Sequence, residues 1–422
     1  DLIVTGVQTC ALPISYAAFS KHCRVDPVNT MRNAFQAVFM TRCCADLGKT
    51  AALIEEIGSF GPTQNGETES ARFLENSLWN AWSHDCRALL WWCAFDQTEL
   101  DYPPYDECSM ERELGLFRAD GSAKPALDVL ERFSGFAAAH PLPPPRRDAV
   151  VLLTRDQDCW SAGFLSFLLA KRAGFDVAFQ FADEPLRPAP LYLMPSVGGF
   201  RILPRGRYRE LLAAVERGAS LYVSADDAGI EPFDPFGVPV RTISGRSAPA
   251  RIVGEACGLD LTLDCPHEIR LGRGAAEVLA HDGAGNPAFS CASYGKGKLF
   301  FLNVPLETSL APLPRLFEPD SPPYERIYRI LAARAGIRRL VTRDNPAVTL
   351  TEHPVSDRRV LVVAVNNSPE AQQVRFETAP GWRFISGAET RIEGNSGALF
   401  ELETIGTRNP VPAEVKEEAA AF

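Results

Sequence analysis

Between residues 149 and 224 the sequence alternates short apolar runs with longer segments of helical pattern, and this alternation restricts the possible folds more than any other feature. Short apolar runs are typical of strands that are buried on both faces of a parallel sheet. The runs expected to be strands are residues 149–153, 177–181, 191–195 and 219–224. Residues 160–173 and 206–217 have the apolar spacing of helices. Strands that alternate with helices predict an α/β fold with a doubly wound parallel sheet.

A further apolar run, residues 50–62, meets two carboxylates, Glu55 and Glu56, before it breaks at glycine and proline. A run of this kind suits a buried strand of an α/β sheet. Acidic residues at the carboxyl end of such a strand lie where α/β barrels hold their catalytic groups. The alternative interpretation is a solvated strand end.

The next strand is predicted at residues 88–97, which are again apolar, end in Asp96 and Gln97, and carry Trp91 and Trp92 near that end. Helical spacing and a proline at a first helical position predict helices around these two strands. The expected helices are residues 26–47, with Asp26-Pro27 at the N-cap, residues 68–84 and residues 123–139.

A strand with a carboxylate, then a helix, then a strand that ends in tryptophan resembles strands seven and eight of the clan A glycoside hydrolases, a large group of (β/α)8 barrels. In that group the nucleophile lies in a motif of Glu, an aromatic or aliphatic residue, and Gly, which Glu56-Ile57-Gly58 matches. The resemblance implies that Glu56 is the nucleophile and that Glu55 is the less favoured candidate.

The same resemblance implies a sugar-binding role for the end of the second strand. A tryptophan at that position floors the sugar subsite in the family, and Trp92 or Trp91 is in place to do so. Asp96 and Gln97 at the same strand end are expected to contact substrate. The expected partner is an oligosaccharide or polysaccharide with a β-glycosidic bond.

A retaining glycosidase needs a second carboxyl about 5 Å from the nucleophile, to protonate the leaving oxygen and then activate water. In the resembled group it lies in an Asn-Glu motif at the end of strand four, and no segment here corresponds to strands one to five. Residues 1–14 resemble a translated sequencing adapter, so the biological sequence would begin near Ser15 and any signal peptide would lie upstream. We therefore expect part of a retaining glycosidase that does not hydrolyse glycosides by itself.

A stiff Pro-rich linker, residues 140–148, precedes the alternating region. That region resembles the Rossmann-like, glutamine-amidotransferase-like domain of family 42 β-galactosidases, which builds a trimer interface and bears no catalysis. A hairpin at residues 286–305, turning at Gly295 and Gly297, and a helix at residues 322–335 suit that domain. No Gly-x-Gly-x-x-Gly follows the first strand, so no dinucleotide cofactor is expected.

From residue 337 the pattern changes to short strands at roughly ten-residue spacing, which predict a β-sandwich. These strands are residues 348–351, 360–365, 374–376, 382–385 and 398–402. The expected organisation is an adapter-derived segment at 1–14, the last strands of a partial (β/α)8 barrel at 15–139, the linker at 140–148, the Rossmann-like domain at 149–336, the β-sandwich at 337–409 and a tail at 410–422.

The composition argues against several other classes of function. A net charge of −10 and a pI of about 5.3 leave no basic surface for nucleic acid. No apolar run reaches the roughly 18 residues of a membrane helix. Eleven cysteines without a Cys-x-x-Cys pair indicate reduced thiols rather than zinc ligands, and favour a reducing compartment such as the cytoplasm. No metal or cofactor is expected.

Three alternatives stay open at this point. The chain could be a non-catalytic carbohydrate-binding or assembly protein in which Glu56 is incidental. It could be an amidotransferase-like hydrolase that uses Cys159 as nucleophile, which would require a partly ionised, accessible thiol. Among glycosidases, β-galactosidase-like or β-mannosidase-like activity leads over a family 5 cellulase-like activity.

Overall fold

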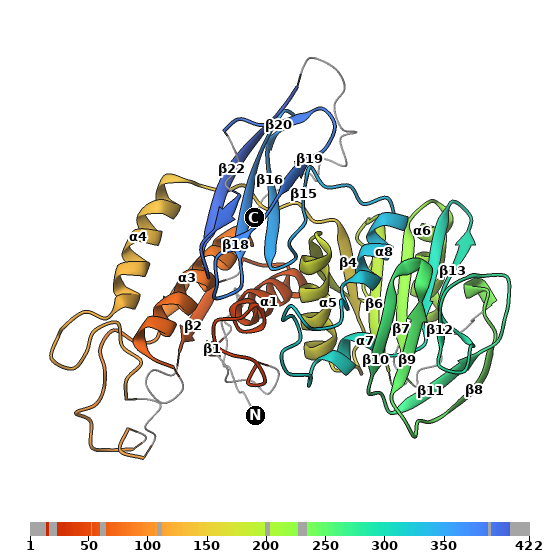
Figure 1. Cartoon of the computed structure of the whole chain (residues 1–422), viewed down its shortest axis with the longest axis horizontal. Helices are drawn as coiled ribbons and strands as arrows, with labels where there is room; N and C mark the ends of the chain where they lie inside the picture. Colours follow the sequence, from red (N-terminus) through yellow and green to blue (C-terminus); the bar gives the residue numbers. More distant parts are fainter. Residues whose placement is uncertain are drawn as a thin grey trace.

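The computed structural model describes residues 14–16, 23–51, 53–59, 65–103, 105–107, 112–198, 203–226, 234–386 and 390–405. The expected adapter segment, apart from Ile14, and the expected tail lie outside the described residues. Figure 1 shows helices α1, α3 and α4 on one side, a large sheet on the other, and the C-terminal strands above both. Among the described residues, no helix combines the length and apolar character needed to cross a bilayer.

The N-terminal part is a small parallel sheet in the order β1-β2-β3, with helices between its strands. Its strands are β1 (Ile14–Tyr16), β2 (Ile54–Gly58) and β3 (Leu89–Trp91), and its helices are α1 (Met31–Gly48), α3 (Glu67–Ser83) and α4 (Pro125–Ala139). The predicted helices at 68–84 and 123–139 are confirmed. A strand is found at the carboxylate pair, but it begins at Ile54, so Glu55 and Glu56 lie inside it rather than at its carboxyl end as expected.

The predicted start of the first helix is wrong. Helix α1 begins at Met31 with Thr30 as its N-cap, rather than at Asp26-Pro27. Asp26 instead forms an ion pair with Arg32 (2.9 Å) and accepts a hydrogen bond from the backbone N–H of Arg315 (2.6 Å). The Asp-Pro pair therefore belongs to a turn that is fixed by distant residues, a role that helix-start signals do not reveal.

The second predicted strand is also shorter than expected. β3 ends at Trp91, and the backbone after it pairs with residues 114–117 instead of extending the sheet. The N–H of Cys93 donates to the carbonyl of Leu114 (3.2 Å), and that of Asp96 donates to the carbonyl of Phe117 (2.8 Å). Residues 92–97 thus form a loop at the end of the strand.

The largest sheet has nine strands in the order β10-β9-β12-β13-β14-β7-β6-β4-β5. It is parallel from β5 to β14 and antiparallel from β14 to β10. Its strands are β4 (Ala149–Leu153), β5 (Val177–Phe181), β6 (Leu191–Val197), β7 (Ser220–Ala225), β9 (Ala250–Gly254), β10 (Leu259–Leu263), β12 (Glu277–Asp282), β13 (Pro287–Tyr294) and β14 (Gly297–Leu302). The four predicted strands and the hairpin are confirmed, whereas the other antiparallel strands were not predicted.

Helices cover both faces of the parallel half. Val151 and Leu153 of β4 belong to the core that contains α5 (Cys159–Ala173), and the intervening Leu152 belongs to the core that contains α6 (Arg205–Glu216). This alternation follows from the side-chain period of a strand. The remaining elements of this region are α7 (Leu306–Leu310), α8 (Arg326–Arg334), the antiparallel pair β8 (Val240–Gly245) and β11 (His267–Leu271), and 3-10 turns at Asp234–Phe236 and Glu255–Cys257.

The N-terminal part shares a core with this sheet. Phe39 of α1 packs against Phe164 of α5 and Phe179 of β5, with ring centroids 5.2 and 5.5 Å apart. Ile54 and Ile57 of β2 belong to the same core. The small sheet is therefore held against the large one by continuous apolar packing, which places β2 firmly.

The C-terminal part is a four-stranded antiparallel sheet in the order β16-β17-β22-β20, with two additional strand pairs. The strands are β15 (Val341–Arg343), β16 (Val348–Ser356), β17 (Arg359–Asn366), β18 (Gln372–Gln373), β19 (Phe376–Thr378), β20 (Trp382–Phe384), β21 (Arg391–Ile392) and β22 (Gly397–Thr404). Val363 and Val365 of β17 pack against Trp79 of α3 and Phe133 of α4. Four of the five predicted strands are confirmed, and residues 374–376 fall largely between β18 and β19.

Candidate functional site

Strand β2 carries the two candidate carboxylates out of the core. Ile54 and Ile57 are fully buried, whereas Glu55 is exposed and Glu56 is half-buried. The pairing of β2 with β3 is irregular between Ile54 and Ile57, which lets both isoleucines enter one core although three positions separate them. Glu55 and Glu56 therefore lie outside that core, with Glu56 the more sheltered of the two.

The two tryptophans at the end of β3 have different environments. Trp91 lies opposite Ile57 and donates its indole N–H to the carbonyl of Leu114 (3.1 Å), half-buried in the core. Trp92 is 37% exposed, and its backbone N–H donates to the carbonyl of Ile57 (2.9 Å). The peptide between Trp92 and Cys93 is cis. The backbone of a residue with an exposed indole thus bonds to the residue that follows Glu56.

Asp96 and Gln97, which are expected to contact substrate, both have partners in or near the loop after β3. The carboxylate of Asp96 accepts hydrogen bonds from Lys124 Nζ (2.6 Å) and from the N–H of Gly115 (2.9 Å), with the ion pair almost fully buried. The N–H of Gln97 donates to the carbonyl of Arg112 (2.7 Å). These bonds give both residues a place in holding the loop after β3.

A cluster of small polar groups at the end of β2 was missed by sequence reasoning. Asn65 Nδ2 donates to Ser59 Oγ (2.6 Å) and Ser70 Oγ (2.8 Å), and the two hydroxyls are 2.9 Å apart. The cluster ties the residue that follows β2 to the first turn of α3. Its members are spread over twelve positions of ordinary polar sequence, so no local motif marks them.

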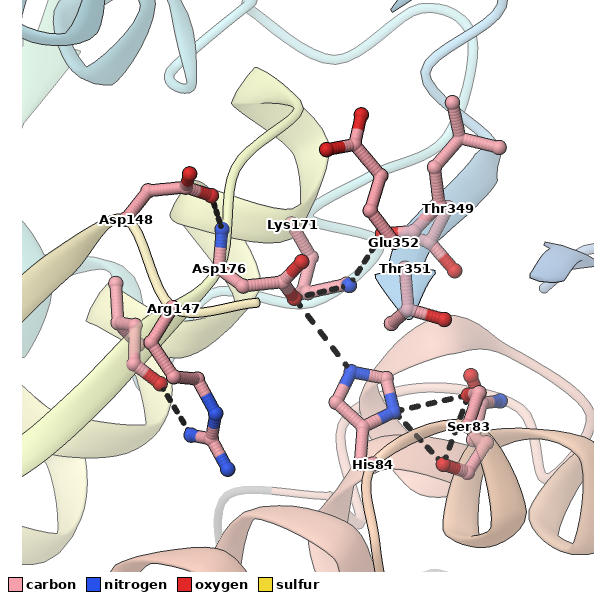
Figure 2. A network of polar contacts seen from close by, with 12 residues as sticks. Ser83, His84, Arg147, Asp148, Lys171, Asp176, Thr349, Thr351 and Glu352 are labelled. Carbon is pink, nitrogen blue, oxygen red and sulfur yellow. Dashed lines mark hydrogen bonds and ion pairs between the residues drawn. The ribbon is translucent and has the colours of Figure 1, made fainter. Parts of the chain in front are cut away.

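A group of buried charged side chains lies where α5, the linker and β16 meet, and Figure 2 shows Asp148, Lys171, Asp176 and Glu352 of this group. Lys171 of α5 donates to Asp176 (2.5 Å) and to the carbonyl of Leu350 (2.7 Å). Arg339 contacts Asp176 (2.9 Å), Asp148 (2.5 Å) and Glu352 (3.3 Å). We call Asp148, Lys171, Asp176, Arg339 and Glu352 the ionic cluster.

Strongly shifted pKa values are common at functional sites, and by this criterion alone the ionic cluster would be a candidate site. Burial lowers the pKa of Lys171 to about 8. Burial alone would raise the pKa of Asp176, but Lys171 and Arg339 bring it far below its usual range. All five side chains are at most 5% exposed, and Arg146, which is 36% exposed, adds a third positive charge beside the carboxylates of Asp148 (3.0 Å) and Glu352 (3.5 Å). A closed, paired cluster has no room for a substrate, so we assign it to joining α5, the linker and β16.

Two buried histidines beside this cluster predict loss of stability in acid. Burial holds the pKa of His84 well below its usual value and lowers that of His353 to about 4. In the unfolded chain the two imidazoles take up protons near pH 6.5, whereas in the folded chain they do so only at lower pH. The free energy of unfolding is therefore highest above pH 6.5 and falls as the pH drops toward the pKa values of the folded chain. For His353 the loss from pH 7 to pH 5 is expected to be about 2 kcal/mol.

Urea unfolding at pH 7 and pH 5 tests this expectation. His353→Gln should reduce the difference between the two free energies of unfolding, whereas His140→Gln should leave it unchanged because His140 is exposed. A wild-type protein that is equally stable at both pH values would contradict the assignment.

Cys159 lacks the features of an activated nucleophile. Its thiol donates to the carbonyl of Thr154 (3.0 Å), and burial raises its pKa. A raised pKa lowers the fraction of thiolate, which is the reactive form. Among the described residues, no group of three or more His, Cys, Asp or Glu side chains is placed to hold a metal ion.

Two surface hollows lie on the α/β part, away from β2 and β3. One, of about 410 Å³, is lined by residues 246–249 and 264–266. The other, of about 480 Å³, is lined by residues of the β5–β6 connection and of α6. Neither includes the carboxylates or the tryptophans, so they do not extend the candidate site.

Comparison with solved structures finds glycosidases with the same fold. The β-galactosidase of Rahnella sp. R3 matches 93% of this chain and 60% of its own length, with a TM-score of 0.66 and 13% identity. The β-galactosidase of Halorubrum lacusprofundi matches 92% and 60%, with a TM-score of 0.64 and 15% identity. The exo-β-1,4-mannosidase Op5Man5 of Opitutaceae bacterium strain TAV5 matches 71% and 55%, with a TM-score of 0.58 and 19% identity.

These likenesses show the fold. The chain spans between 55% and 60% of the length of these three structures. No protein-family model matches the sequence, and no curated protein matches it.

Proposed function

We propose that this chain is part of a retaining β-glycosidase and that Glu56 is its nucleophile. The observation that carries the proposal is the adjacency of Glu56, the middle residue of β2, and Trp92, which directly follows β3, outside the apolar core. The hydrogen bond from the N–H of Trp92 to the carbonyl of Ile57 fixes that adjacency. The fold shared with β-galactosidases and a β-mannosidase supports it.

In the proposed reaction, Glu56 attacks the anomeric carbon of a sugar ring that lies on the exposed face of Trp92. A covalent glycosyl-enzyme forms, and water later hydrolyses it. A second carboxyl about 5 Å away must protonate the leaving oxygen. Of the proposed barrel, this chain contributes β1, β2 and β3, and we place the second carboxyl on another strand of that barrel. The present chain is therefore not expected to turn over substrate.

We further propose that β1, β2 and β3 are the last strands of a (β/α)8 barrel, followed by a Rossmann-like domain and a β-sandwich. In this division residues 140–148 are the linker, and the last of them, Asp148, belongs to the ionic cluster. Substrates are β-galactosides or β-mannosides, in line with the structural neighbours, which are β-galactosidases and a β-mannosidase. The Rossmann-like domain is the proposed region of assembly into a trimer.

Reading the DNA upstream of the codon for Ser15 tests this proposal. We expect an open reading frame that encodes five or six further strand-helix units, with Asn-Glu at the end of the fourth strand. A start codon near Ser15 would contradict it and would favour a non-catalytic carbohydrate-binding or assembly protein.

A further inference from the structure

We propose that the C-terminal end of α5 is a binding site for a divalent oxyanion of the phosphate type, held by Arg329 of α8 and Arg343 of β15. The ligand would bind where the proposed Rossmann-like domain meets the proposed β-sandwich. This inference is independent of the proposed glycosidase function, because the site involves neither Glu56 nor the strands around it.

The first observation is an excess of positive charge around the last turn of α5. Arg172, Arg329 and Arg343 lie close enough to influence one another's charges. Among the described residues, Glu325 is the one carboxylate paired with them, at 3.5 Å from Arg172 and 3.7 Å from Arg329. The carbonyls at a helix C-terminus supply only about half a negative charge. More than one positive charge is therefore left without compensation, which suits a divalent anion.

The second observation is that two of these guanidinium groups converge on one carbonyl oxygen. Arg343 Nη2 donates to the carbonyls of Lys171 (2.9 Å) and Arg172 (3.1 Å), and Arg329 Nη2 donates to the same carbonyl of Arg172 (3.5 Å). The two Nη2 atoms are therefore at most 6.6 Å apart, which is the sum of their distances to that oxygen. An oxyanion whose oxygens accept bonds of about 2.8 Å can bridge two guanidinium groups at this separation.

The third observation is that both side chains keep donors for a ligand. Within the described parts of the chain, Nη1 of Arg343 and Nη1 of Arg329 have no hydrogen-bond partner. Nη1 of Arg343 is not fully buried, and 43% of the Arg329 side chain is exposed. Gly174 places no side chain over this Nη1, since a Cβ there would lie 3.4 Å from it. An anion can therefore reach both guanidinium groups from solvent.

The electrostatics of the site agree with an anionic ligand. Burial, together with the positive charges of Arg329 and Arg172, lowers the pKa of Arg343 to about 9. An anion between the guanidinium groups would offset this mutual repulsion and so stabilise the folded chain. Guanidinium groups match the oxygens of phosphate with parallel N–H donors, and a phosphate group carries between one and two negative charges near pH 7.

The site lies away from the sheet that the proposed function extends. In Figure 1, α5 lies between α1 and α8, so the α8 side of α5 faces away from the β1-β2-β3 sheet. The barrel strands that the proposed function adds at that sheet are therefore not expected to cover Arg329.

Thermal unfolding in phosphate and in chloride, at pH 7 and equal ionic strength, tests the inference on the present chain. Inorganic phosphate at about ten times its dissociation constant is expected to raise the unfolding midpoint by about 2 °C, along a saturation curve. Arg329→Gln should lose the saturable shift, and it should still fold because Arg329 is exposed. The control is Arg251→Gln on β9, which breaks an exposed ion pair with Asp260 (3.0 Å) and should keep the shift.

Methyl phosphate, tested in the same way, distinguishes two sources of the ligand. A saturable shift with methyl phosphate assigns the site to phosphate esters, and a shift with inorganic phosphate alone assigns it to the free anion. A shift that rises without saturation, or one of equal size in Arg329→Gln, would indicate a general salt effect and overturn the inference. No shift with either compound would overturn it as well. None of these results bears on Glu56, so the proposed function stands or falls separately.

Discussion

Replacing Glu56 by Gln is expected to lower the turnover of an aryl β-glycoside at least about a thousandfold in the protein that carries the complete barrel. A carboxylate attacks the anomeric carbon, and an amide of nearly the same shape does not. The side chain is half-buried and outside the core, so the substitution should leave folding intact.

The matched control is Glu55→Gln, one residue away on the same strand. Glu55 is exposed, and its replacement is expected to change turnover by no more than a few fold. Initial rates with aryl β-galactoside and aryl β-mannoside, measured for both variants, separate the two carboxylates. A larger loss in Glu55→Gln than in Glu56→Gln would reverse the assignment.

Replacing Arg339 by Met is expected to destabilise the folded chain by about 3–5 kcal/mol, because it breaks a buried ion-pair network from one side. Arg339 is 5% exposed and contacts Asp148, Asp176 and Glu352. Its removal leaves these carboxylates with less compensating charge in a site that water does not reach. Urea unfolding at pH 7 measures the loss.

The control for this substitution is Arg383→Met. Arg383 pairs with Glu403 at 2.6 Å, but its side chain is 64% exposed. Exposed pairs contribute about 0–1 kcal/mol, so this variant should unfold almost as the wild type does. Similar losses in the two variants would show that the ionic cluster does not hold the regions together.

The elements that the sequence predicted well are those with the most regular burial. Strands β4, β5, β6 and β7 were placed to within about two residues, because nearly every position is buried between two helical layers and most are apolar. Strands β9 and β10 were not predicted from the sequence. They are five residues long, and exposed positions alternate with buried ones, which leaves too short a pattern to distinguish from a loop.

The candidate site was predictable only in part. The neighbouring positions of Glu56 and Trp92 follow from two parallel strands that lie side by side. The position of Asp96 depends on Lys124, which lies 28 residues further along the chain, and no local pattern shows that contact. Phe95 looked like the interior of a strand, and its exposure results from the early end of β3 at Trp91.

The ionic cluster illustrates the same limit at longer range. Its charges lie at residues 148 to 352 and come together only after α5 packs beside β16. In the sequence each of them reads as a solvated charge, because charged residues are seldom fully buried without partners. The proline-rich composition of residues 140–148 therefore predicted a spacer. In the structure Asp148, its last residue, is held in the buried ionic cluster.

The central claim is that Glu56 forms the covalent intermediate. A 2-deoxy-2-fluoro-β-glycoside with a good leaving group traps such an intermediate, because the fluorine slows both its formation and its hydrolysis and the good leaving group speeds only its formation. Proteolysis and mass spectrometry of the treated protein, with its barrel complete, should locate one fluoroglycosyl group on Glu56. An adduct on Glu55 or on any other residue, or no adduct in a protein that turns over the parent glycoside, would contradict the claim.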